Sequence, residues 1–293
     1  MSLLAVIDPG DEVLLPDPGY TCYEGQVRLC GGVPVRFPLL KKDGFVPNPD
    51  VVKKHITPKT RAIILNYPHN PTGAILSKNN LLQLADVLVK HRLYIISDEV
   101  YSEFVYEGSC ASPLSLSRLC DRTIAVSSLS KTYAMTGWRL GYITAHPALI
   151  SQISKTQEAM ASCLPEFVLD AGAAALNGPQ SCVAQMRKAF QKRRDLLLQG
   201  LADIRCFRPI VPAGGLCAFF DISSTGITGH QFALQLLQQA NVLTCGGEAF
   251  GSEGKNCLRI SFCADEKKLI AGISKIKEFA IQFGGNHESF VYH

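Results

Sequence analysis

Short runs of apolar, often β-branched residues alternate with segments of helical periodicity along the first half of the chain. Six of these runs predict β-strands, at Glu12–Pro16, Val33–Pro38, Ala62–Asn66, Leu93–Ser97, Thr123–Ser127 and Arg139–Thr144. Between two of them, Leu81–His91 has the apolar spacing of an amphipathic helix. Strands that alternate with helices are typical of a largely parallel sheet covered by helices, so we predict an α/β fold.

The pattern changes after Pro147, where longer helical stretches replace the alternation. Two stretches predict helix first, Ala148–Leu176 and Cys182–Ile204. Beyond Pro209, the chain has two predicted strands and two predicted helices, at Gly215–Ile222, Cys257–Phe262, His230–Ala240 and Glu266–Phe283. This second part indicates a smaller α+β unit. We therefore predict two domains, residues 1–182 and residues 183–293.

Composition and charge exclude several classes of protein. Of the 293 residues, 47% are apolar and 18% are charged, so we expect neither disorder nor a fibrous repeat. The formal net charge is +4 and is spread along the chain, which predicts no nucleic-acid partner. We interpret the densest basic cluster as a solvated helix face, formed by Arg187, Lys188, Lys192, Arg193 and Arg194.

Neither a membrane span nor an export signal is predicted. Ile210–Phe220 is the longest notable apolar stretch, and it is far shorter than the roughly 20 residues of a membrane helix. Met1–Ile7 has no basic region and ends too soon for a secretory signal. The eleven cysteines form no Cys-x-x-Cys pair, so we predict reduced thiols, no metal site and a cytoplasmic protein.

Polar side chains follow three of the predicted strands directly. The first strand leads to Asn70, in a proline-rich loop, and the second leads to Asp98 and then Tyr101. The third leads to a longer polar group, Ser128, Ser130, Lys131 and Arg139. Open α/β sheets bind ligands at the carboxyl ends of their strands, so we expect these side chains to meet at one edge.

The residue types suit a phosphorylated pyridine cofactor. A partly desolvated lysine beside another cation can act as a nucleophile toward a carbonyl. A carboxylate stabilises a protonated ring nitrogen, phenol and amide groups hydrogen-bond a phenolate oxygen, and hydroxyls with a guanidinium bind phosphate. These are the groups that pyridoxal 5'-phosphate requires.

The motifs resemble those of the class I/II aminotransferases, which are pyridoxal phosphate enzymes of fold type I. Four segments agree in order and spacing: Asn66-Tyr-Pro-His-Asn-Pro-Thr-Gly, Ser97-Asp-Glu-Val-Tyr, Ser128-Leu-Ser-Lys-Thr-Tyr-Ala-Met-Thr-Gly-Trp-Arg-Leu-Gly and Arg259-Ile-Ser-Phe. The resemblance implies a large domain with helices on both faces of a mostly parallel sheet, and a smaller C-terminal α+β domain. It also implies transfer of an amino group between an amino acid and a 2-oxo acid, by a homodimer.

The same resemblance implies a role for each matching residue. Lys131 would be the Schiff-base lysine and proton carrier, with Asp98 on the pyridine nitrogen and Tyr20 stacked on the ring. The remaining cofactor ligands would be Tyr101 and Asn70 at the ring hydroxyl, and Ser128, Ser130 and Arg139 at the phosphate. Lys131, Asp98 and Tyr101 would form the catalytic set. Arg259, with Asn70 beside it, would bind the α-carboxylate of the substrate.

The sequence departs from this family at its start. Before Pro9 only Met1–Ile7 matches, and the glycine-containing turn that normally binds the cofactor phosphate at a helix N-terminus is missing. We therefore expect a large domain truncated at its N-terminus, and the activity of the chain stays open. Two alternatives remain: a β-lyase or related enzyme acting on a Cα carbanion, and a truncated aminotransferase-like protein without catalysis. A cofactor-binding transcription regulator is disfavoured, because no DNA-binding element precedes Pro9.

Overall fold

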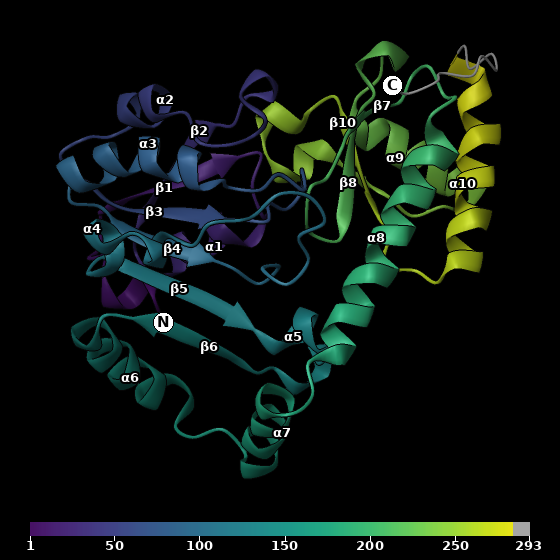
Figure 1. Ribbon diagram of the computed structural model, residues 1–293. Helices are drawn as coiled ribbons and strands as arrows, with labels where there is room; N and C mark the ends of the chain where they lie inside the picture. Colours follow the sequence, from purple (N-terminus) through teal and green to yellow (C-terminus); the bar gives the residue numbers. More distant parts are fainter. Residues whose placement is uncertain (284–293) are drawn as a thin grey trace.

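The first half of the protein forms a six-stranded sheet (Figure 1). The structure is a computed structural model that describes residues 1–283. The sheet consists of β1 (Glu12–Asp17), β2 (Val33–Pro38), β3 (Thr60–Asn66), β4 (Tyr94–Asp98), β5 (Thr123–Ser128) and β6 (Gly141–Ala145). Its order is β2-β1-β3-β4-β5-β6, and all neighbours are parallel except β5 and β6. The predicted strands are therefore confirmed to within about two residues at each end.

Helices cover both faces of this sheet, as the resemblance implied. They are α1 (Cys22–Leu29), α2 (Pro49–Lys54), α3 (Lys78–Lys90), α4 (Ser117–Cys120), α5 (Leu129–Thr132), α6 (Pro147–Ala161) and α7 (Glu166–Asn177). Alternate residues of a strand point to opposite faces. On β3, Ile63 and Leu65 accordingly pack with Leu84 of α3, whereas Ala62 and Ile64 pack on the other face with Ile153 of α6.

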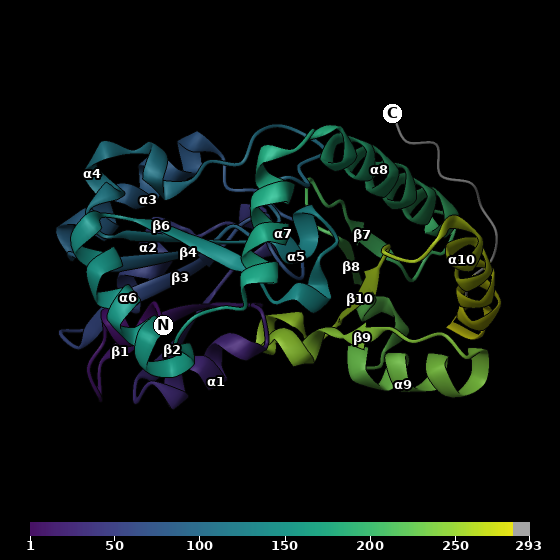
Figure 2. The same ribbon diagram turned by 90° about the horizontal axis from the view of Figure 1, so that it is seen from below.

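A second, antiparallel sheet follows in the order β7-β8-β10-β9. Its strands are β7 (Arg208–Ile210), β8 (Cys217–Asp221), β9 (Cys245–Gly246) and β10 (Cys257–Ser261). Helices α8 (Ser181–Leu201), α9 (Gly229–Ala240) and α10 (Glu266–Ala280) surround it (Figure 2). Their buried side chains share one core with this sheet, in which Phe220, Phe232 and Leu258 are fully buried. The predicted α+β unit is thus present, while its division from the first part near residue 182 stays a prediction.

Short 3-10 helices occupy several connections. They are η1 (Leu3–Ala5), η2 (Lys41–Asp43), η3 (Pro113–Ser115), η4 (Thr136–Trp138), η5 (Ser223–Thr225), η6 (Gly247–Phe250), η7 (Ser252–Gly254) and η8 (Ile281–Phe283). Among residues 1–283, no helix is long and apolar enough to cross a membrane. All eleven cysteines are free thiols.

Three expectations were wrong in detail. The helical stretch Ala148–Leu176 is two helices, because Ser162 has a left-handed φ of 51° and Pro165 has no N–H with which to continue α6. Arg139 precedes β6 instead of starting it, and has a left-handed φ of 53°. In the basic cluster, Arg194 is not solvated but only 5% exposed.

Candidate active site

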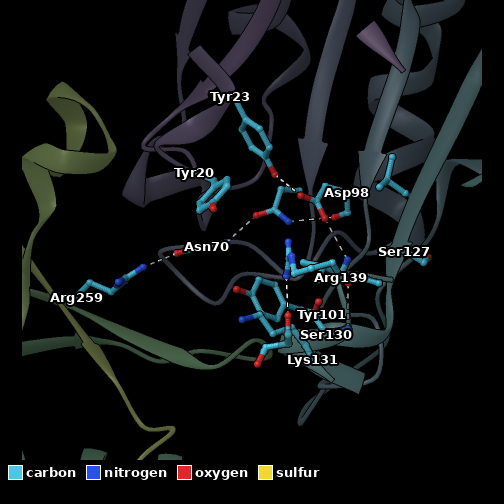
Figure 3. A pocket seen from close by; sticks show the side chains of 15 residues that line it. Tyr20, Tyr23, Asn70, Asp98, Tyr101, Ser127, Ser130, Lys131, Arg139 and Arg259 are labelled. Atoms are coloured by element: carbon cyan, nitrogen blue, oxygen red, sulfur yellow. Dashed lines mark hydrogen bonds between the residues drawn. The ribbon is translucent and has the colours of Figure 1, made fainter. Parts of the chain in front are cut away.

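A cavity of about 540 Å³ lies where the carboxyl ends of β3, β4 and β5 face the second sheet (Figure 3). All nine side chains predicted from the sequence line it: Tyr20, Asn70, Asp98, Tyr101, Ser128, Ser130, Lys131, Arg139 and Arg259. They come from five separate parts of the chain. The parallel arrangement of β3, β4 and β5 brings most of them to one edge, and β10 carries Arg259 to the opposite side of the cavity.

Asp98 is held in one orientation at the end of β4. The Tyr23 hydroxyl donates to its Oδ2 atom over 2.6 Å, and the Val100 backbone N–H donates to its Oδ1 atom over 3.2 Å (Figure 3). Burial raises the pKa of the Asp98 carboxyl above its ordinary value, while these two hydrogen bonds act in the opposite direction. The site therefore has a fixed carboxylate whose charge depends on a tyrosine that the prediction did not include.

Asn66 and Asn70 connect the ends of β3 and β4. The Asn70 backbone N–H donates to Asn66 Oδ1 over 3.1 Å, and Asn66 Nδ2 donates to the Asp98 carbonyl over 3.1 Å. Both asparagines are nearly fully buried, at 2% and 8% exposure. These bonds fix the loop after β3, so the Asn70 side chain is held against the cavity.

Lys131 lies in the short helix α5, directly after β5. Ser128 caps this helix, since its Oγ accepts from the Ser130 backbone N–H over 3.1 Å. Arg139 is exposed, and its Nη1 donates to the Thr136 carbonyl over 2.8 Å. Two hydroxyls, an ammonium and a guanidinium thus border the same end of the cavity, a combination that suits an anionic group.

Arg259 forms the opposite wall from β10. Its Nη1 donates to Asn70 Oδ1 over 3.3 Å, and its guanidinium carbon lies 4.8 Å from the centre of the Phe250 ring. Its Nε is buried and has no hydrogen-bond partner among the described residues. A partly buried guanidinium with an unpaired buried Nε favours a carboxylate ligand, because an unpaired buried donor costs free energy.

Two further tyrosines face the cavity. Tyr20 is 39% exposed and meets Tyr23 edge to face, with 5.3 Å between the ring centres. A hydrogen bond with Cys22 and partial burial raise the pKa of Tyr20. Burial likewise raises the pKa of Tyr101, so both phenols keep their protons and can donate hydrogen bonds at neutral pH.

Sequence reasoning missed four polar residues that line this cavity: Tyr23, Asn66, Ser127 and Thr136. Tyr23 is three residues after Tyr20, in the first turn of α1, and that helix was not predicted. Asn66 was assigned to the strand alone, although a polar residue at the last position of a buried strand is itself a signal. Thr136 lies in the segment between Lys131 and Arg139, where nothing in the spacing singles it out.

Residues 1–276 match the family described as aminotransferase class I and II. Among curated proteins, the arginine–pyruvate transaminase of Pseudomonas aeruginosa is 39% identical over 273 residues, covering 93% of this chain and 68% of that protein. An aspartate aminotransferase of Pyrococcus abyssi is 38% identical over 281 residues, covering 95% of this chain and 72% of that protein.

Solved structures show the same architecture. An aromatic aminotransferase from Pyrococcus horikoshii superposes with a TM-score of 0.93 at 38% identity, covering 97% of this chain and 77% of that one. The aspartate aminotransferase of Thermus thermophilus with maleate superposes with a TM-score of 0.88 at 33% identity, covering 94% of this chain and 71% of that one.

Proposed function

Because the chain belongs to the aminotransferase class I and II family of pyridoxal phosphate-dependent enzymes, we propose that its cavity binds pyridoxal phosphate and an amino acid substrate. One observation carries this proposal: Lys131, Asp98 and Arg259 line a single cavity although they lie far apart in the sequence. Amino group transfer needs three groups: a nucleophile, a fixed carboxylate, and a guanidinium with a hydrogen-bond donor left for the substrate.

The residues of the cavity fit this cofactor. Asp98 would hold the pyridine nitrogen, with Tyr20 on the ring face. The other ligands would be Tyr101 and Asn70 at the ring hydroxyl, and Ser128, Ser130 and Arg139 at the phosphate. When bound, pyridoxal phosphate supplies an electron sink for the negative charge that develops at the substrate Cα.

Each side chain then has a definite task. Asp98 keeps a proton on the ring nitrogen, and the 2.6 Å hydrogen bond from Tyr23 favours the charged carboxylate that this requires. Lys131 would hold the cofactor covalently through its Nζ atom, and the same amine when free would carry the Cα proton of the substrate. Arg259 orients the substrate through its α-carboxylate, with Asn70 Oδ1 fixing one side of the guanidinium.

The partners follow from the same proposal. The substrates are an amino acid and a 2-oxo acid, which exchange an amino group in two half-reactions. We also propose that the protein is a homodimer of the cytoplasm, where its eleven free thiols stay reduced.

The test uses the purified chain with added pyridoxal phosphate. After borohydride reduction, mass spectrometry is expected to find a pyridoxyl group on Lys131, and 2-oxo acid formation from a panel of L-amino acids is expected to require a second 2-oxo acid. Lys131→Ala should abolish both, while Lys155→Ala on the exposed face of α6 should abolish neither. Ammonia release that needs no second 2-oxo acid would contradict the transfer reaction in favour of elimination.

A further inference from the structure

A buried carboxylate joins the two sheets outside the cavity. Asp17, the last residue of β1, is only 5% exposed. Its Oδ2 atom accepts from the Ser252 backbone N–H over 3.1 Å and from the Ser252 hydroxyl over 2.8 Å, and its Oδ1 atom accepts from the Glu253 N–H over 3.1 Å. In Figure 1, the yellow-green segment that contains these donors lies close to the purple strand β1. We call Asp17 with Phe250–Glu253 the corner contact.

The backbone at Gly251 is closely packed against the Asp17 carboxylate in the corner contact. Gly251 has a φ of 136°, and a Cβ atom there would lie 2.0 Å from Asp17 Oδ1, so only glycine brings the backbone this close. The carbonyl of Phe250 accepts from the Gly19 N–H over 2.8 Å and from Arg36 Nη1 over 3.2 Å. Gly19 and Arg36 therefore bind the same segment, Phe250–Glu253, as Asp17 does.

The corner contact leads directly to the cavity. The fully buried ring of Phe250 lies against the guanidinium of Arg259, with 4.8 Å between the guanidinium carbon and the ring centre. On the other side, Tyr20 follows Asp17 by three residues and lines the same cavity. The position of Arg259 relative to Tyr20 is thus set through Phe250 and the hydrogen bonds of Asp17.

We infer that Asp17 is a positioning residue for the α-carboxylate subsite, acting through Phe250 on Arg259. This inference rests on the proposed function, in which Arg259 binds the carboxylate. Burying a carboxylate costs free energy that its neutral donors here only partly offset. Stabilisation of the fold alone would therefore not favour a charged group at this position. An acceptor with two oxygens is needed, however, to hold two backbone N–H groups and one hydroxyl in place.

The test measures binding of carboxylates that have no amino group. The protein loaded with pyridoxal phosphate is titrated with 3-phenylpropionate and with maleate, and the dissociation constants are read from the cofactor absorbance. Asp17→Asn replaces one acceptor by a donor, so both dissociation constants are expected to rise about tenfold, with the affinity for the cofactor within about twofold of wild type. Amide exchange at residues 250–254 should also become faster. Asp170→Asn, on the exposed surface of α7, is the matched control and should change none of these quantities.

A double substitution separates positioning from a general structural effect. If Asp17 acts through Arg259, Asp17→Asn changes carboxylate binding less than about twofold when Arg259→Lys is already present. Equal effects in both backgrounds, or a parallel loss of cofactor affinity, would overturn the inference. Wild-type protein that binds cofactor but neither carboxylate would instead overturn the proposed role of Arg259, and unchanged amide exchange in Asp17→Asn would then overturn the corner contact as well.

Discussion

His69 is a buried histidine whose pKa is strongly lowered by its surroundings. It is 2% exposed, its Nδ1 shares a 2.8 Å hydrogen bond with Thr72 Oγ1, and its ring stacks on Tyr67. Burial lowers the pKa of the imidazole from 6.5 to about 3. His69 is therefore neutral at physiological pH, beside Asn70 in the loop that borders the cavity.

The lowered pKa of His69 makes the free energy of unfolding depend on pH. Between pH 6.5 and about 3 the unfolded chain binds a proton at His69 and the folded chain does not, so the free energy of unfolding falls as the pH falls. The slope from this residue approaches about 1.4 kcal/mol per pH unit. Urea unfolding of wild type and His69→Asn between pH 7.5 and 5 measures it. The variant should have a lower free energy of unfolding at pH 7.5, but this free energy should fall less between pH 7.5 and 5 than in wild type. An equal fall in both proteins would contradict the lowered pKa of His69.

The residue scale also shows what the sequence could reveal about the site. Lys131, Asp98 and Arg259 stand in motifs, so pattern and resemblance together located them. Tyr23 could not be found in this way, because its importance lies in a single hydrogen bond to Asp98 across 75 positions of the chain. Contacts of this kind depend on how α1 packs against β4, which no local pattern encodes.

At the scale of elements, the loop between β3 and α3 is fixed by one glycine. Gly73 has a φ of 73°, and a Cβ atom there would lie 2.1 Å from the Cβ of Pro212. Its N–H donates to the His69 carbonyl over 2.7 Å, and its carbonyl accepts from the Gly214 N–H over 2.9 Å. The loop that carries Asn70 is therefore pressed against the segment that enters β8.

Gly73→Ala and Gly44→Ala form a matched pair. Gly44 also has a positive φ, of 66°, but open space around the position of a Cβ atom. Gly44→Ala is expected to cost about 1 kcal/mol of unfolding free energy from backbone strain alone. Gly73→Ala should cost about 2 kcal/mol more, because its methyl group collides with Pro212. Chemical denaturation measures both, and equal losses would show that the two loops are not packed as described.

Elements differ in how well sequence predicts them, and the reason is length. The six strands of the first sheet are five to seven residues long and mostly apolar, and β2 begins and ends at the predicted residues. By contrast, β9 has two residues and β7 has three, too few for any periodicity. The break between α6 and α7 was readable from Pro165, but the apolar residues on both sides favoured one long helix.

At the scale of the whole molecule, Arg194 connects the two sheets. From α8, its Nη1 donates to Glu107 Oε1 over 2.8 Å and to the Pro212 carbonyl over 3.0 Å, and its guanidinium lies 5.1 Å from the centre of the Tyr106 ring. Residues 106 and 107 belong to the segment after β4, and residue 212 leads into β8. From sequence alone, a run of charged residues on a helix is interpreted as a solvated face. The burial of Arg194 could not be predicted, because it depends on the segments that pack against α8.

Arg194→Ala should destabilise the protein by about 3 kcal/mol, since it leaves a buried carbonyl and two acidic side chains without their partner. Lys192→Ala is the control from the same helix. Lys192 is 68% exposed, and its ion pair with Glu266 should be worth at most about 0.5 kcal/mol. Thermal and urea unfolding measure both variants, and similar small losses would show that Arg194 is solvated after all.

The division of the cavity between distant parts of the chain affects its synthesis. The groups that we propose for the cofactor lie between residues 20 and 139, whereas Arg259 is synthesised later, with β10. Domains emerging from the ribosome fold in order from the amino end. A nascent chain stalled before β10 would therefore present the proposed cofactor pocket without the arginine that we propose for α-carboxylates, and selectivity for amino acids would begin only when β10 joins its sheet.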